Sequence, residues 1–186
     1  MKSILAIIVL LALVSPSMAT PLSQSPDWRD SFYLFANLTR ASWEGFMAEF
    51  HHQDVYELPA KCFGKDFAND IIEIVNIISA REEFILEIIE VVEKLGNMYE
   101  LTQGNCDTDK IYQEISEQCS KVNCDVFSLV WRGEQNMPKL LSLYDDMNTW
   151  FSKHYADYEE ARKGFLHVGS DWADAAEIIL AMEQSS

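Results

Sequence analysis

The sequence predicts an all-α protein, built as a single antiparallel bundle of five or six helices stapled by two disulfides. After Pro26, apolar residues recur at the three-to-four-residue spacing of a helix face, and no segment alternates as a β-hairpin would. The chain has only seven glycines and five prolines, which we interpret as marks of helix ends. The four cysteines are an even number, which suits two paired bonds.

The first residues have the three-part pattern of a secretory signal peptide. Lys2 precedes an apolar run over 4–14, and small residues surround a cleavage point after Ala19. A bilayer span needs about 20 apolar residues, so this run is too short for an anchor. We expect residues 1–19 to be removed, residues 20–26 to form a short tail, and residues 27–184 to form one exported helical domain.

The first half of the domain should contain a long central helix. An aromatic-rich helix is predicted over 27–50. A rod should follow, with Asp66 as its N-cap, a broad face of isoleucine and valine, and Gly96 as its C-cap.

The second half should contain shorter helices and two longer ones. Short helices are predicted over 107–119 and around 125–133. A long helix should run from about Asn136 to Gly164, and Ser170 should cap the last helix. His154 lies on the apolar stripe of the long helix, so we interpret it as a core histidine.

The cysteines are interpreted as disulfides because an exported chain meets an oxidising environment. Zinc sites use two paired knuckles, and Cys62 and Cys106 do not form a second pair beside Cys119 and Cys124. A catalytic thiol would need a base partner, and no histidine lies near these cysteines in the sequence.

The predicted rod constrains the pairing of the cysteines. Its length is on the order of 45 Å, so Cys62 and Cys106 at its two ends should lie far apart. Cys106 and Cys119 would be ~20 Å apart across an intact helix, whereas bonded cysteines need α-carbons about 6 Å apart. We predict Cys62–Cys119 and Cys106–Cys124. Local pairing of Cys119 with Cys124 stays open if the chain after Gly96 returns.

The most metal-like local cluster is His51 and His52 with Asp54 and Glu57. Adjacent histidines in a loop can share a metal, but the sequence fixes no further ligand nearby. We interpret the cluster as a solvated turn and expect no metal or cofactor.

Composition and motifs argue against several functions. Thirty Asp and Glu against fourteen Lys and Arg give a formal net charge of −16, which disfavours nucleic acid and anionic membranes as partners. The sequence has no G-x-S-x-G elbow, no H-E-x-x-H pair and no glycine-rich phosphate loop. We therefore expect a protein without catalytic activity.

Two surface features complete the prediction. Asn37 begins an N-L-T sequon, which is a candidate glycosylation site in an exported chain. The first helix carries a candidate binding patch of aromatic residues: Trp28, Phe32, Phe35 and Trp43.

Two functions fit these features. The first is a secreted, acidic, glycosylated interaction or structural subunit of an extracellular assembly, which associates with itself or with a protein partner. The alternative is a secreted carrier of a small hydrophobic ligand, such as a lipid, bound between helices. The sequence favours the first, because the aromatic-rich segment has no cysteine and is free to contact a neighbour.

Overall fold

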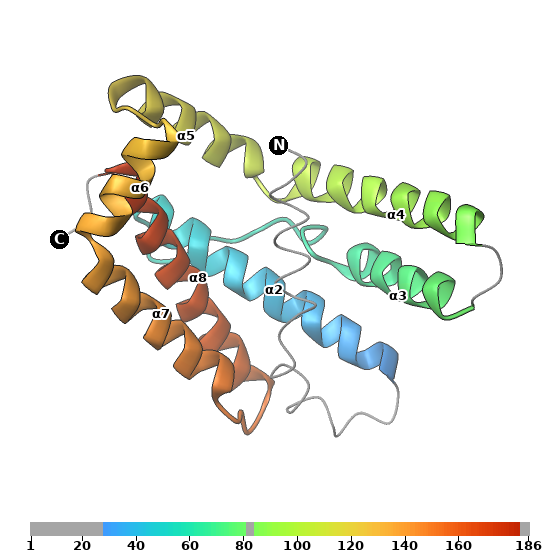
Figure 1. Ribbon diagram of the computed structural model, residues 1–186. Coiled ribbons are helices and arrows are strands. Elements are labelled where there is room, and N and C mark those ends of the chain that lie inside the picture. Colours follow the sequence, from blue (N-terminus) through green and yellow to red (C-terminus); the bar gives the residue numbers. More distant parts are fainter. Residues whose placement is uncertain (1–27, 81–83, 183–186) are drawn as a thin grey trace.

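The computed structural model describes residues 28–80 and 84–182, in which the regular structure is entirely helical (Figure 1). The seven described helices are α2 (Trp28–Phe50), α3 (Lys65–Ala80), α4 (Phe84–Asn105), α5 (Thr108–Lys121), α6 (Val126–Gln135), α7 (Met137–Ser152) and α8 (Tyr158–Leu180). The all-α prediction is confirmed, whereas the predicted number of five or six helices is wrong. No described helix is long and apolar enough to cross a bilayer. The predicted signal peptide and tail lie outside the described residues.

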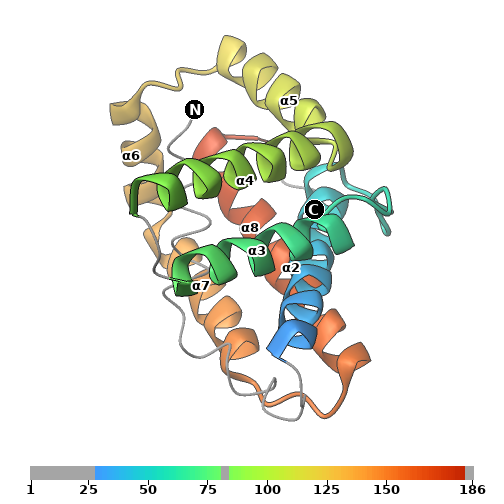
Figure 2. The ribbon, with the colours of Figure 1, turned by 90° about the vertical axis from the view of Figure 1, so that its right-hand side faces the viewer.

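The predicted central rod is two helices. α3 ends at Ala80, and α4 continues past Gly96 to Asn105, so Gly96 is not a C-cap. Figures 1 and 2 show α3 and α4 side by side and running in opposite directions. Phe67 of α3 and Met98 of α4 share one buried cluster. The prediction was wrong because an apolar stripe records a buried face and does not say which element covers it.

The predicted boundary between the last two helices is also wrong. α7 ends at Ser152, and His154 is exposed in the connection that follows instead of lying in the core. α8 then runs through both Gly164 and Ser170 without a break.

The start of α8 is fixed by a reciprocal cap. The Glu160 backbone N–H donates to Asp157 Oδ1 at 2.9 Å, and the Ala156 N–H donates to Glu160 Oε2 at 2.9 Å. This arrangement resembles a capping box, which satisfies backbone donors that the first turn of a helix leaves unpaired.

α2 and α8 form the central packing of the molecule, which we call the α2–α8 seam. Glu44 of α2 pairs with Arg162, while Ser170 donates to Glu49 further along both helices. Residue numbers rise together along the two helices, so α2 and α8 run in the same direction. An antiparallel arrangement therefore does not describe this pair.

Two glycines allow the close approach at the seam. A β-carbon on Gly45 would lie 2.0 Å from the Leu166 carbonyl oxygen, and one on Gly169 would lie 1.8 Å from the Ser42 carbonyl oxygen. Neither glycine has a positive φ. Their role is therefore to let two backbones touch and not to permit an unusual backbone conformation.

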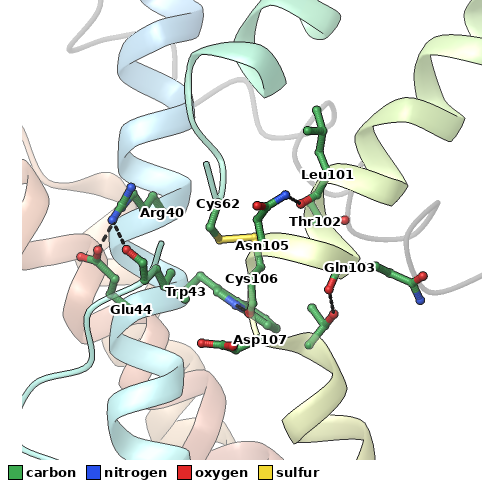
Figure 3. Close-up of a disulfide and its surroundings, with 12 residues drawn as sticks. Arg40, Trp43, Glu44, Cys62, Leu101, Thr102, Gln103, Asn105, Cys106 and Asp107 are labelled. Atoms are coloured by element: carbon green, nitrogen blue, oxygen red, sulfur yellow. Dashed lines mark hydrogen bonds and ion pairs between the residues drawn. A yellow bond between two sulfur atoms is a disulfide. The ribbon is translucent and has the colours of Figure 1, made fainter. Parts of the chain in front are cut away.

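The main core lies where the C-terminal end of α2 meets the chain on both sides of α3 and α4. Phe50 is only 2% exposed and packs with Met47, Cys62 and Cys106. Trp43 Nε1 donates to the Cys106 carbonyl oxygen at 2.9 Å (Figure 3). The α3–α4 pair is thus anchored to α2 by packing and a hydrogen bond, and the Cys62–Cys106 disulfide closes the base of the pair.

Candidate functional site: an apolar face on α6 and α7

The start of α6 is fixed by a disulfide and a cap. Cys119 near the end of α5 is bonded to Cys124 just before α6. Asp125 is the N-cap, and its Oδ1 accepts the Ser128 backbone N–H at 2.9 Å. The Ser128 hydrogen bond lowers the pKa of the Asp125 carboxyl, because it favours the charged form. Asp125 therefore stays anionic at neutral pH.

Polar side chains hold α5 and α6 to the C-terminal end of α8. Arg132 of α6 donates through Nε to the Ile179 carbonyl oxygen at 2.6 Å, and through Nη2 to the Asn123 carbonyl oxygen at 2.9 Å. Gln118 of α5 donates to the Ala181 carbonyl oxygen at 2.7 Å. The last carbonyls of a helix lack intrahelical donors, so these side chains complete the end of α8.

As a result, the apolar side of α6 faces solvent. No residue of α6 is buried, and its half-buried positions are Ser128, Leu129, Arg132 and Gly133. Phe127 is 88% exposed and Trp131 is 60% exposed. The bulkiest apolar side chains of α6 therefore face solvent, whereas an amphipathic helix ordinarily turns them toward the core.

The exposed apolar side chains continue along α7. A single residue, Asn136, separates the two helices, which follow one another along one edge of the molecule (Figure 1). Another side of α7 packs against α8, and Met147 is buried. We call the exposed set the α6–α7 face: Val126, Phe127, Val130, Trp131, Met137, Leu141 and Tyr144.

Sequence reasoning did not identify the α6–α7 face. The bulky pairs at 126–127 and 130–131 share one helix face, and this signal is present in the sequence. The same pattern is typical of a buried face, however. Only the placement of Arg132 on the inner side of α6 shows that the apolar side is uncovered.

The residues of the predicted aromatic patch all belong to α2. Trp43 packs against the main core and stacks on Phe46, with ring centroids 5.1 Å apart. Phe32 and Phe35 are half-buried, and the side chain of Trp28 lies outside the described part of the structure. The indole N–H of Trp43 needs a partner when it is buried, and the Cys106 carbonyl provides it.

The four cysteines form two disulfides as predicted, but the predicted pairing is wrong. The bonds are Cys62–Cys106, with α-carbons 4.8 Å apart, and Cys119–Cys124, with α-carbons 5.3 Å apart. α3 and α4 fold back on one another, so Cys106 returns to Cys62 (Figure 3). The alternative left open for Cys119 and Cys124 is the arrangement observed.

The sequon at Asn37 lies on α2, and its asparagine is exposed. The neighbouring Leu38 points into a buried cluster with Ala41 and Phe165. The asparagine is therefore presented on the solvent side of a helix whose opposite side is packed.

The two adjacent histidines diverge to different helices. His51 Nδ1 lies 3.0 Å from Glu114 Oε1 of α5, and His52 Nδ1 lies 4.0 Å from Glu177 Oε1 of α8. The two carboxylates of the predicted cluster are exposed. Within residues 28–80 and 84–182, no group of three or more ligand-type side chains is arranged to hold a metal ion.

Buried and half-buried carboxylates gather at the C-terminal half of the α2–α8 seam. Glu177 is 1% exposed, and its Oε1 has no hydrogen-bond partner. Burial raises the pKa of Glu177, and the nearby charges of Asp174 and Glu49 raise it further, while His52 opposes them. Burial also raises the pKa values of Asp171 and Asp174.

A surface hollow lies between α3 and α4, and most of the residues that line it are polar or charged. Glu73, Asn76 and Ile77 contribute from α3, and Glu93 and Lys94 contribute from α4. Lys94 pairs with Glu73 across the hollow, and its ammonium also lies 3.7 Å from Asp70. The ion pairs join the two helices, so we interpret this hollow as part of their packing.

Comparison with known proteins finds no matching family model, no similar curated protein and no similar solved structure.

Proposed function

We propose that the protein is a secreted, non-catalytic interaction subunit of an extracellular assembly, and that it contacts a protein partner through the α6–α7 face. The outward apolar side of α6 is the observation that supports this proposal. Exposed apolar residues gathered on one face mark interaction sites, and aromatic side chains contribute most to interface cores.

Export is supported by the leader pattern and by the two disulfides. Bonded cysteines persist in oxidising compartments and are rare in the cytosol. The exposed Asn37 sequon is accessible to the glycosylation that secretory proteins receive. The acidic composition is also consistent with export, since a strong net charge helps to keep a protein in solution.

The proposal of a non-catalytic role rests on how the polar clusters are used. His51 and His52 pair with carboxylates of α5 and α8, and thereby join separate helices. Ser170 donates to Glu49 within the α2–α8 seam. These groups have packing partners and do not converge on an open cleft, as a nucleophile and its base would.

Site-specific photocrosslinking tests the proposed surface. A photoreactive phenylalanine analogue replaces Phe127, and in a matched control it replaces Tyr112, which is exposed on α5 outside the face. Each protein is irradiated in the native extracellular fluid and analysed by mass spectrometry. We expect one discrete protein adduct from position 127 and none from position 112.

Two outcomes would contradict the proposal. Equal labelling at both positions would show that the α6–α7 face has no specific contact. A monomer that instead carries a small mass removable by denaturation would support the alternative function, a carrier of a small hydrophobic ligand. Native mass spectrometry of the unlabelled protein distinguishes the second outcome.

A further inference from the structure

The charged residues around the α6–α7 face are predominantly acidic. Asp125 begins α6, Glu134 is exposed on the same side as the apolar residues, and Asp145 is exposed next to Tyr144 on α7. The basic residue of α7 is Lys139, in the first turns of the helix. The rim of the face therefore has more negative than positive charge.

The basic residue of α6, Arg132, does not neutralise the negative charge of this rim. Arg132 is turned inward, and its guanidinium donates to the carbonyl oxygens of Ile179 and Asn123. Its hydrogen-bonding groups are used to hold α6 against α8. A partner that approaches the outer side of α6 meets Asp125 and Glu134 instead of this guanidinium.

The net charge of the whole chain also favours a positively charged partner. A formal net charge of −16 repels a second copy of this chain and an anionic lipid surface. The same field attracts a cationic protein and speeds its association.

Building on the proposed function, we infer that the α6–α7 face binds an amphipathic, basic helical segment of a different protein. Apolar side chains of that segment cover Phe127 and Trp131, and its lysine or arginine side chains meet Asp125, Glu134 and Asp145. Helices commonly bind other proteins in this way, with one apolar side buried and a charged rim that selects the partner.

Two synthetic helical peptides with the same leucine pattern test this inference. One carries lysine and the other glutamate at its polar positions, and each is labelled for fluorescence anisotropy with the full mature protein. We expect the lysine peptide to bind and its affinity to fall as salt is added, because salt screens the rim charges. We expect no binding of the glutamate peptide.

Variants of the protein locate the binding to the face. Trp131→Ser should weaken binding of the lysine peptide by about ten-fold or more, since aromatic side chains dominate interface energetics. The control Tyr112→Ser removes an exposed aromatic residue from α5 and should leave binding unchanged. Glu134→Lys should weaken binding by about three-fold, whereas Glu100→Lys, the same charge change on α4, should have a smaller effect.

The outcomes separate this inference from the proposed function. Equal binding of both peptides, or no binding of either, would overturn the inference. If position 127 still crosslinks to a native protein, the proposed function survives that result. Binding to phosphatidylcholine vesicles that is lost in Trp131→Ser, without peptide binding, would overturn the inference in favour of a lipid surface.

Discussion

The α2–α8 seam and α6 use apolar and polar residues in opposite ways. At the seam, glycines bring two backbones together and large side chains such as Phe50 fill the adjoining core. On α6, Arg132 faces inward and Phe127 faces outward. Apolar side chains near the seam therefore stabilise the fold, whereas those on the outer side of α6 remain exposed and can contact another molecule.

The largest expected contrast is between two phenylalanines. Phe50→Ala should lower the free energy of unfolding by about 4 kcal/mol, because it leaves a cavity in the core. Phe127→Ala should change the free energy of unfolding by less than about 0.5 kcal/mol, since its side chain is already in water. Urea denaturation followed by circular dichroism measures both. Similar losses from the two variants would show that α6 is covered.

The second-largest expected difference is between the two disulfides and concerns how much each contributes to the free energy of unfolding. The Cys62–Cys106 bond spans a sequence separation of 44 and the Cys119–Cys124 bond one of 5. On loop-closure entropy alone, replacing the first pair by serine should cost about 4 kcal/mol and replacing the second about 2 kcal/mol. Denaturation of each double variant under non-reducing conditions tests the order. A larger loss from the second pair would contradict the expected dependence of disulfide stabilisation on loop length.

Two glycines, Gly169 at the seam and Gly133 on α6, should respond in opposite ways to replacement by alanine. Gly169→Ala should cost about 3 kcal/mol, because the new methyl group collides with the Ser42 carbonyl oxygen and forces the helices apart. Gly133→Ala on α6 should raise the stability by up to about 1 kcal/mol, because alanine favours helix and its methyl group meets only Leu140 at 4.0 Å. Thermal unfolding of both variants checks this. Equal stability of the Gly169 variant and the wild type would rule out the close backbone contact.

The smallest expected effect is on the pH dependence of stability. Burial raises the pKa of Glu177, so the stability it contributes is present below its unfolded pKa and is lost as the pH rises through its folded pKa. Asp125 has a lowered pKa, so its contribution is present at neutral pH and is lost as the pH falls.

Glu177→Gln tests the seam half of this prediction. The variant keeps the shape of the side chain but cannot ionise, so its gain in stability on going from about pH 7 to about pH 5 should be smaller than that of the wild type. Asp125→Asn is the counterpart on α6, and because the Asp125 pKa is lowered, this variant should lose less stability than the wild type as the pH falls from about 5 to about 3. Urea titrations from about pH 7 to about pH 3 measure both profiles. An unchanged profile in Glu177→Gln would mean that this carboxyl does not titrate between the two pH values.

Some of the helix boundaries can be predicted from the sequence. The Asp157-x-x-Glu160 pattern is typical of a helix start, and in the structure these two side chains cap the first turn of α8. Gly164 and Ser170 misled the prediction because these residues are typical of helix ends. In the folded protein Gly164 lies against Tyr155, and Ser170 donates to Glu49, so both serve packing inside one helix.

The candidate site was harder to predict than the fold class. Trp43 has the same aromatic character as Trp131, yet the first enters the core and the second stays exposed. The helices that carry these two tryptophans have similar apolar patterns. The local sequence does not show which element, if any, packs against each side chain. The difference arises because Phe63 and Cys106, on either side of α3 and α4, cover Trp43, whereas α6 contacts α8 through Arg132 and leaves Trp131 exposed.

By itself, the sequence determined the helical class, the acidic charge and the presence of an even set of cysteines. These properties follow from local spacing and composition, which any compact arrangement of the chain preserves. The tertiary structure alone decided that α3 and α4 fold back on each other, and hence that Cys62 meets Cys106. It also decided that α2 and α8 run in the same direction and that α6 presents Phe127 to solvent. The physical reason is that periodicity specifies which side of a helix is apolar, whereas only contacts between distant residues specify what covers that side.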